Sequence, residues 1–179
     1  MGKKVLIFSG SPRRGGNSDV LCDQFMLGAT DAGNEAEKIF IRDRSINYCL
    51  ACGTCYAKKE PCVYSDDMPF IIEKMINADV IVMATPVWFY AMSGQLKALI
   101  DRTIARFLEI RDKDMYFILS AHNDKRDFME RVIEGFRGYM ACLSGAKEKG
   151  VVYGLGVFDV GEIQTHPAMR EAYEMGKSV

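Results

Sequence analysis

Four of the six cysteines in this chain fall in one polar stretch, at Cys49, Cys52, Cys55 and Cys62. Their spacing, C-x2-C-x2-C-x6-C, contains two short steps that share a central cysteine, so three thiolates can gather around one point. Such short steps let the backbone wrap a cubane iron-sulfur cluster, whereas a zinc ribbon separates two such pairs by a longer insert. The spacing therefore favours a [4Fe-4S] cluster and makes zinc the second choice. A cysteine-rich loop that holds no metal stays open as a third interpretation.

The loop Phe8–Asp19, which reads FSGSPRRGGNSD, is suited to binding a phosphate. It lies between an apolar run, residues 5–8, that predicts a buried strand, and a segment with helical periodicity. Free N–H groups and the dipole at a helix N-terminus attract an anion, and Arg13 or Arg14 can add charge-assisted hydrogen bonds. The other candidate ligands are side chains that carry a hydroxyl or an amide: Ser9, Ser11, Asn17 and Ser18.

Two common phosphate-binding loops do not match this stretch. A P-loop needs Gly-Lys-Ser/Thr at its end, but Asn17 follows Gly16, and a dinucleotide-binding loop needs GxGxxG, but Gly10 is followed by Ser11 and Pro12. What remains is similar to the flavodoxin-type loop, which holds a monophosphate with hydroxyl groups. An ordinary tight turn with an Asn17 or Ser18 N-cap is the alternative.

Two further loops could hold the other end of a flavin mononucleotide, which carries a large, mostly apolar ring beside its phosphate. The first contains the candidate ring contacts Pro86, Val87, Trp88 and Phe89. In the second, Ser120 and Ala121 could approach the ring from its pyrimidine side. His122 could assist proton transfer near neutral pH, although it could equally be an ordinary exposed loop residue. The aromatic side chains could instead pack at an interface between subunits.

Strands and helices alternate along the chain, which predicts a parallel sheet with helices on both faces. The predicted strands are residues 4–8, 36–41, 80–84, 115–120 and 150–158. The predicted helices are residues 18–32, 67–77, 93–108, 126–143 and 167–177. We therefore expect a doubly wound α/β fold, and the likeness of the first loop to the flavodoxin-type loop implies a flavodoxin-like three-layer sandwich with strand order 2-1-3-4-5. In such folds the ligand binds beyond the carboxyl ends of the strands, where the loops after strands one, three and four should meet.

Composition narrows the class of protein. With 179 residues, 49% of them hydrophobic, we expect one domain over residues 1–179, with a cysteine-rich insertion at about residues 43–66. The formal net charge of -1 lacks the basic footprint that nucleic acid requires. No apolar run reaches the length of a signal peptide core or a membrane span, so we expect a cytoplasmic protein without a membrane partner.

Several motifs together resemble the NADPH-dependent FMN reductase family of flavodoxin-like proteins. They are GSPRxxGNS after the first strand, DDM at a helix start, ADVIVMATPVWF, and MSGQLKALIDR, and the match runs from the first strand to Arg102. The last helix, residues 171–177, also resembles that of the family. Carried over by position, the resemblance implies phosphate contacts at Ser9, Ser11, Arg13, Asn17 and Ser18, and ring contacts at Pro86, Val87, Trp88 and Phe89. Lys97, Asp101 and Arg102 match a helix motif that we expect to be structural.

The resemblance implies an FMN-dependent oxidoreductase that takes electrons from NAD(P)H and passes them to a small-molecule acceptor such as a quinone. The cysteine spacing is similar to the compact motif of the iron-sulfur flavoproteins, a branch of the same family. That likeness implies the alternative, an electron carrier with FMN and a [4Fe-4S] cluster, fed by ferredoxin. A homodimer or homotetramer is expected, because the family is typically oligomeric. A flavin-free binding or thiol-sensing protein is a third class, but it leaves both ligand loops without a purpose.

Overall fold

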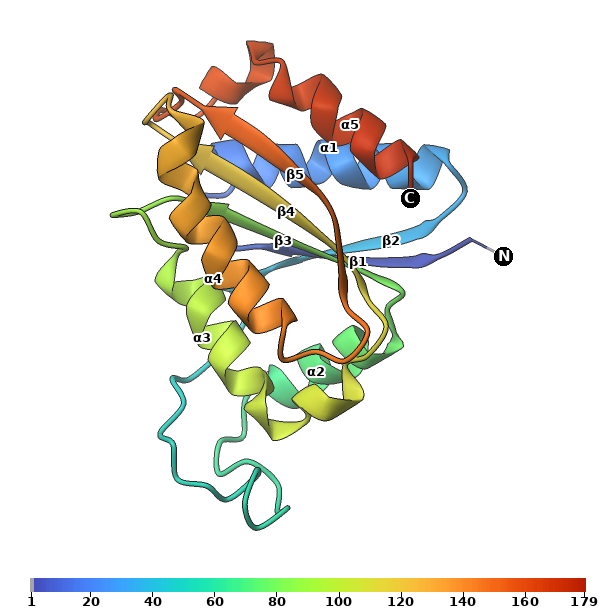
Figure 1. The fold of residues 1–179 in the computed structure, drawn as a ribbon, viewed down its shortest axis with the longest axis vertical. Helices are drawn as coiled ribbons and strands as arrows, with labels where there is room; N and C mark the ends of the chain where they lie inside the picture. The colour runs from blue at the N-terminus through green and yellow to red at the C-terminus, as the bar shows by residue number, and fades with distance from the viewer. Residues whose placement is uncertain (1) are drawn as a thin grey trace.

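The computed structural model describes residues 2–179 and has the predicted architecture, a five-stranded parallel sheet in the order β2-β1-β3-β4-β5 (Figure 1). The strands are β1 (Lys4–Ser9), β2 (Glu35–Phe40), β3 (Val80–Pro86), β4 (Asp114–Ala121) and β5 (Lys147–Leu155). The α-helices are α1 (Asn17–Asp31), α2 (Met68–Asn77), α3 (Gly94–Arg102), α4 (Glu130–Met140) and α5 (Ala168–Lys177). Short 3-10 turns are η1 (Ile41–Asp43), η2 (Thr103–Ala105), η3 (Phe107–Glu109), η4 (Arg126–Met129) and η5 (Glu162–Thr165).

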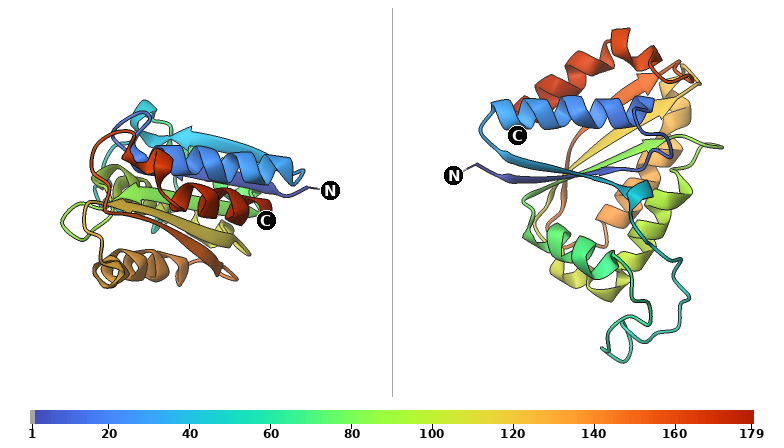
Figure 2. Two further views of the ribbon diagram at one scale, coloured as in Figure 1. Left: turned by 90° about the horizontal axis from the view of Figure 1, so that it is seen from above. Right: turned by 180° about the vertical axis from the view of Figure 1, so that it is seen from behind.

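Helices cover both faces of the sheet and make three layers, with α1 and α5 on one face and α2, α3 and α4 on the other (Figure 2). Side chains of β1 alternate between the two cores, since Val5 and Ile7 pack with α1 and α5 while Leu6 and Phe8 pack with the other helices. Such alternation follows from the two-residue period of a strand. The central strand β3 is buried almost throughout, as expected for a parallel strand covered on both faces.

The two helices of the first layer pack unusually closely. A Cβ atom on Gly28 of α1 would collide with the carbonyl oxygen of Tyr173, and one on Gly176 of α5 would collide with the carbonyl oxygen of Phe25. Both obstacles are backbone atoms, which cannot turn aside as a flexible side chain could. The absence of a side chain at these two glycines is therefore what lets α1 and α5 approach each other.

Some predicted element boundaries were wrong. The helix expected over residues 93–108 ends as α3 at Arg102 and continues as the turns η2 and η3, which are separated by Arg106 with a non-helical φ of -147°. Similarly, residues 126–129 form a 3-10 turn before α4 rather than its first α-helical turn. The last strand covers 147–155 instead of 150–158, so its three predicted final residues belong to a loop.

The polar stretch between η1 and α2 is a long excursion without an α-helix or strand, and it extends away from the body of the fold beyond α2 and α3 (Figure 1). This stretch, residues 44–67, contains the four clustered cysteines and is named the cysteine loop below. In residues 2–179, no helix combines the length and the hydropathy needed to cross a bilayer.

We predict that Gly28→Ala forces α1 and α5 apart and lowers the free energy of unfolding by about 1–3 kcal/mol, the usual cost of overpacking. Gly138→Ala is the matched control, because a Cβ on this exposed residue of α4 meets no atom within 4 Å. There the substitution should be neutral or stabilise by up to about 1 kcal/mol. Urea denaturation of both variants measures the difference, and equal stability would contradict the close-packing argument.

Candidate functional site

The loop between β1 and α1 folds back on itself at the start of the helix. Ser11 Oγ donates a hydrogen bond to the carbonyl oxygen of Arg13 (2.7 Å) and accepts one from its N–H (3.1 Å). A Cβ on Gly16 would lie only 2.6 Å from Ser11 Oγ, so a larger residue does not fit this turn. The turn leads directly into α1, whose cap residue Gly16 supplies no side chain to the first backbone N–H groups. These groups are thus left to an external acceptor.

A buried carboxylate holds the rest of this loop. Asp19, in the first turn of α1, accepts a hydrogen bond from the N–H of Gly15 (2.9 Å) and forms an ion pair with Lys38 of β2 (3.0 Å). Lys38 also bonds Asp23. Burial acts to lower the pKa of Lys38, but hydrogen bonds to Asp23 and Asp19 outweigh it and raise the pKa. The ammonium group therefore stays charged and offsets the negative charge beside the helix N-terminus.

Backbone and hydroxyl hydrogen bonds join this loop to the loops after β3 and β4. The N–H of Val87 donates to the carbonyl oxygen of Ser120 at 2.8 Å, which ties the loop after β3 to the end of β4. Ser93, the N-cap of α3, donates from Oγ to the carbonyl oxygen of Gly10 at 2.8 Å, and its own N–H donates to Thr85 Oγ1 at 2.8 Å. The loops that were expected to meet are thus connected directly.

A cavity of about 160 Å³ lies between these loops. Its lining includes Ser11, Arg13, Asn17, Ser18, Pro86, Val87, Trp88, Ser120, Ala121 and His122. The structure therefore brings together all the predicted flavin-site residues except Ser9 and Phe89. Ser18 sits in this lining with its hydroxyl buried, and in the described residues that hydroxyl has no hydrogen-bond partner. An unpartnered donor at a helix N-terminus suits an anionic group.

The two exceptions have physical causes. Ser9 is the last residue of β1, is fully buried, and its hydroxyl lies beside the thiol of Cys22 on α1 rather than in the cavity. Phe89 is 98% exposed because it lies at the tip of a tight hairpin, in which Trp88 and Ala91 exchange two backbone hydrogen bonds. Phe89 and Tyr90 at this tip both have positive φ, as the two central residues of a type I′ primed turn require.

Sequence reasoning missed one wall of the cavity, which Val157 and Phe158 supply from the loop after β5. Arg13 donates to the carbonyl oxygen of Phe158 at 3.2 Å and its guanidinium lies 5.5 Å from the centre of that ring. The ring of His122 packs edge-on against Phe158 at 5.6 Å. Val157 and Phe158 were placed in the predicted strand 150–158 because of their apolar character. The glycine at position 156 was the signal that the strand had already ended.

The four clustered cysteines line a second cavity, of about 490 Å³, beneath the cysteine loop. All four are free thiols. Cys49 Sγ accepts a hydrogen bond from the N–H of Ala51 at 3.4 Å, and Cys52 Sγ lies 3.4 Å from Thr54 Oγ1, whose hydrogen bond lowers the pKa of Cys52. In the arrangement of residues 2–179, no three potential ligands are spaced to share one metal ion. The donor chemistry fits an iron-sulfur cluster, and the loop must draw its sulfur atoms together to hold one.

Arg102, at the end of α3, anchors this loop. It is buried and donates to both carboxylate oxygens of Asp66 (2.6 and 3.1 Å), to the carbonyl oxygen of Asn47 (2.9 Å) and to Cys62 Sγ (3.3 Å). Burial acts to raise the pKa of Asp66, but hydrogen bonds from Arg102 and from the N–H of Asn47 outweigh it and hold the pKa at about 2. Asp66 Oδ1 also accepts from the N–H of Met68 at the start of α2 (3.2 Å).

A family model described as NADPH-dependent FMN reductase matches residues 3–132. The chain belongs to the NADPH-dependent FMN reductase family. Its similar relatives include an iron-sulfur flavoprotein of Methanosarcina thermophila, 40% identical over 101 residues, which are 56% of this chain and 52% of the relative. An iron-sulfur flavoprotein of Archaeoglobus fulgidus is 39% identical over 101 residues, which are 56% of this chain and 46% of the relative. The chain thus spans about half the length of the curated relatives it matches.

Solved structures agree with this member of the NADPH-dependent FMN reductase family in fold. An FMN-dependent NADH-azoreductase from Bacillus anthracis, solved in complex with FMN, superimposes with a TM-score of 0.74 over 99% of both chains. Its sequence is only 17% identical, so the likeness shows the shared fold and nothing finer.

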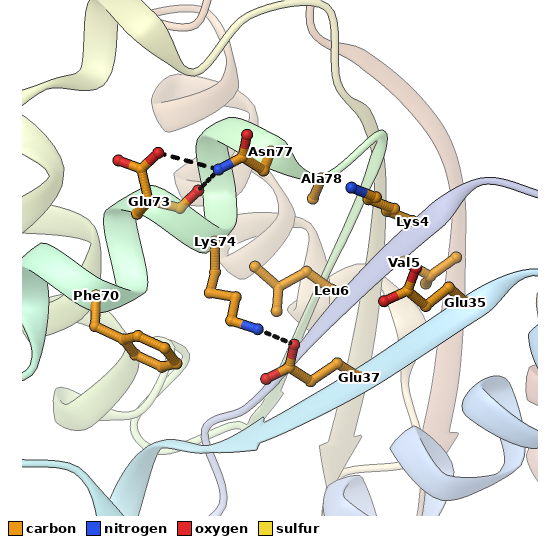
Figure 3. Close-up of a pocket in the computed structure, with 10 residues that line it drawn as sticks. All are labelled: Lys4, Val5, Leu6, Glu35, Glu37, Phe70, Glu73, Lys74, Asn77 and Ala78. Atoms are coloured by element: carbon orange, nitrogen blue, oxygen red, sulfur yellow. Dashed lines mark hydrogen bonds and ion pairs between the residues drawn. The ribbon is translucent and has the colours of Figure 1, made fainter.

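Another hollow, of about 310 Å³, lies between β1, β2 and α2, near the start of β1 (Figure 3). Two interactions join polar side chains of its lining, since Lys74 Nζ donates to Glu37 Oε2 at 2.7 Å and Asn77 Nδ2 donates to the side chain of Glu73 at 3.1 Å (Figure 3). We assign this hollow no ligand.

His166 has a structural role, because its Nδ1 accepts a hydrogen bond from the N–H of Ala168 at the start of α5 (3.1 Å).

The low pKa of Asp66 predicts a pH-dependent contribution to stability. A carboxylate with a pKa of about 2 in the fold and about 3.9 when unfolded stabilises the protein above pH 3.9 by roughly 2 kcal/mol. The contribution is lost as the pH falls from about 4 to about 2. Asp66→Asn should therefore cost roughly 2 kcal/mol at pH 7, and its deficit relative to the wild type should shrink over that window.

Urea denaturation at pH 7, 4, 3 and 2 measures this dependence. Asp67→Asn is the control, since the carboxylate of Asp67 accepts one bond from the N–H of Ser45 at the surface (2.8 Å) and should be worth less than about 1 kcal/mol. A deficit of Asp66→Asn that stays constant from pH 7 to pH 2 would contradict the ion-pair explanation.

Proposed function

We propose that this chain is an FMN-dependent oxidoreductase that holds the phosphate of FMN at the start of α1 and the flavin ring between the loops after β3 and β4. The observation that carries this proposal is the buried, unpartnered hydroxyl of Ser18 at the N-terminus of α1. It lies in the same cavity as Trp88, Ser120 and Ala121. Membership of the NADPH-dependent FMN reductase family supports the same assignment.

In this proposal the chain binds and orients the cofactor. FMN, when bound, supplies hydride and single-electron chemistry at its ring. Asn17 and Ser18 present backbone N–H groups and side chains to the phosphate, while the hydrogen bond between Val87 and Ser120 keeps the two ring-bordering loops together. His122 lies exposed at the rim of the same cavity.

We propose NAD(P)H as the electron donor and a small molecule such as a quinone as the acceptor, in keeping with the family description. A homodimer or homotetramer is part of the proposal. Its support is the exposure of large apolar side chains close to both cavities: Tyr48, Leu50, Val63 and Phe89. Three of these residues belong to the cysteine loop, and contact with a second subunit would remove their apolar surface from water.

A second candidate function is favoured by one specific observation, the four free cysteines that line a single cavity. With a [4Fe-4S] cluster there, the protein would be an electron carrier with two redox centres, fed by ferredoxin. The relatives named iron-sulfur flavoproteins support this version. The two versions differ in the donor that reduces the flavin and in the presence of iron.

Anaerobic purification followed by flavin, iron and sulfide assays, then reduction by NADPH or by reduced ferredoxin, tests both versions. We expect one FMN per chain, since there is one phosphate cradle. Iron at about four atoms per chain and reduction by ferredoxin alone would establish the carrier. Iron-free protein with steady NADPH turnover would establish the reductase instead, and protein without stoichiometric flavin would overturn both.

We predict that Ser18→Ala weakens FMN binding roughly tenfold or more, because a hydrogen bond to a charged phosphate is worth about 1.5–3 kcal/mol. The thermal stability of the FMN-free protein should not fall, since the buried hydroxyl has no partner to lose. Ser9→Ala is the matched control: it removes a buried hydroxyl outside the cavity and should leave the Kd within about twofold. Flavin fluorescence titration gives both values, and an equal loss of affinity in the two variants would place the phosphate elsewhere.

A further inference from the structure

Every polar contact of the buried Arg102 guanidinium ends on the cysteine loop. Nη1 donates to the carbonyl oxygen of Asn47 and to Asp66, and Nη2 donates to Asp66 and to Cys62 Sγ. The ring of Tyr64 lies 5.0 Å from the guanidinium carbon. The side chains of Arg102 and Asp66 are 3% and 0% exposed, so solvent screens this charge little.

The sulfur atom that Arg102 contacts belongs to Cys62. Of the four cysteines, Cys62 is the one whose position is least constrained by the spacing in the sequence. Cys49, Cys52 and Cys55 follow one another in short steps, whereas six residues separate Cys55 from Cys62. A separate device is therefore needed to bring Cys62 to the others. The planar guanidinium can bond a carboxylate with two parallel hydrogen bonds and still direct another N–H at a third atom, which a lysine cannot do.

We propose that Arg102 is a positioning residue for Cys62 and that it raises the reduction potential of an iron-sulfur cluster bound by the cysteine loop. The proposal rests on the second candidate function above, in which the four cysteines bind the cluster. A cluster gains negative charge when it is reduced. A hydrogen bond from a buried guanidinium to a ligand sulfur therefore favours the reduced form, and Arg102 also offsets the negative charge that Asp66 would otherwise place beside the cluster.

Arg106 offers a matched comparison on the same segment. Together with Arg102, Cys55 and Cys62 it lines the hollow of about 460 Å³ on the other side of the loop. Its guanidinium is half-exposed and bonds Glu73 and Glu109, each at 2.7 Å. Replacing Arg106 thus removes a nearby positive charge but no recorded bond to sulfur.

The test compares Arg102→Gln, Arg102→Lys and Arg106→Gln with the wild type as anaerobically purified, FMN-loaded protein. The cluster potential is measured by redox titration followed by electron paramagnetic resonance of the reduced cluster, and FMN content reports whether the fold is intact. For Arg102→Gln we expect normal FMN content and at least a tenfold shift toward the oxidised cluster at a fixed potential. A tenfold shift is about 59 mV for a one-electron couple. Arg102→Lys keeps the positive charge, so it should restore part of the wild-type potential. Arg106→Gln should change the ratio of oxidised to reduced cluster less than about twofold.

An unchanged potential in Arg102→Gln, or an equal shift in Arg106→Gln, would overturn the role of Arg102 while leaving the cluster itself established. If Arg102→Gln loses FMN or the cluster, Arg102→Lys decides: a lowered potential supports the proposal and an unchanged one overturns it. Wild-type protein with FMN but without iron and sulfide would instead remove the second candidate function, and this proposal with it.

Discussion

Parallel pairing of β1, β3 and β4 is the constraint on which the cavity at the carboxyl ends of these strands depends. The hydrogen bonds between strands continue past their ends, since the N–H of Gly10 donates to the carbonyl oxygen of Ala84 and that of Val87 to the carbonyl oxygen of Ser120, both at 2.8 Å. Each ligand loop therefore leaves the sheet already aligned with its neighbour. Because backbone atoms make these bonds, the position of the cavity tolerates changes in side chains. The choice of ligand is left to side chains of the lining, such as those of Ser18 and Trp88.

Helix α3 carries that alignment to the second cavity. Its N-cap Ser93 is bonded to the loop after β1 through Gly10, and its last residue, Arg102, is bonded to the cysteine loop. At 1.5 Å per residue, the nine residues of α3 span about 14 Å. One helix therefore sets the separation between the loop after β1 and the cysteine loop.

The sequence was sufficient to locate the strands, because buried apolar runs are local signals, and the resemblance to flavodoxin-like proteins supplied their order. The loops after the first and third strands were local signals too, and they contain many of the residues that line the cavity. The sequence was insufficient where tertiary structure or an unusual turn sequence determined the position of a residue. Phe89 was placed against the ring, but a primed turn turns it outward, and Phe-Tyr is not among the pairs that normally mark such turns. Phe158 was missed because the last strand was predicted to end at residue 158, whereas β5 ends at Leu155. The motif ending at Arg102 was expected to be structural, and only the fold shows which loop its guanidinium reaches.

The ion pair between Arg102 and Asp66 is better explained as a device for position than as a source of stability. Removing both charges from water costs several kcal/mol per ion, and replacing a buried pair with apolar residues is often neutral or stabilising. What apolar residues could not do is hold Asn47, Asp66 and Cys62 in fixed directions around one point. The cysteine loop lacks an α-helix or strand of its own, so it has few other means to fix its sulfur atoms. The cost of burial is offset only while the loop surrounds the guanidinium, which makes loop and arginine depend on each other.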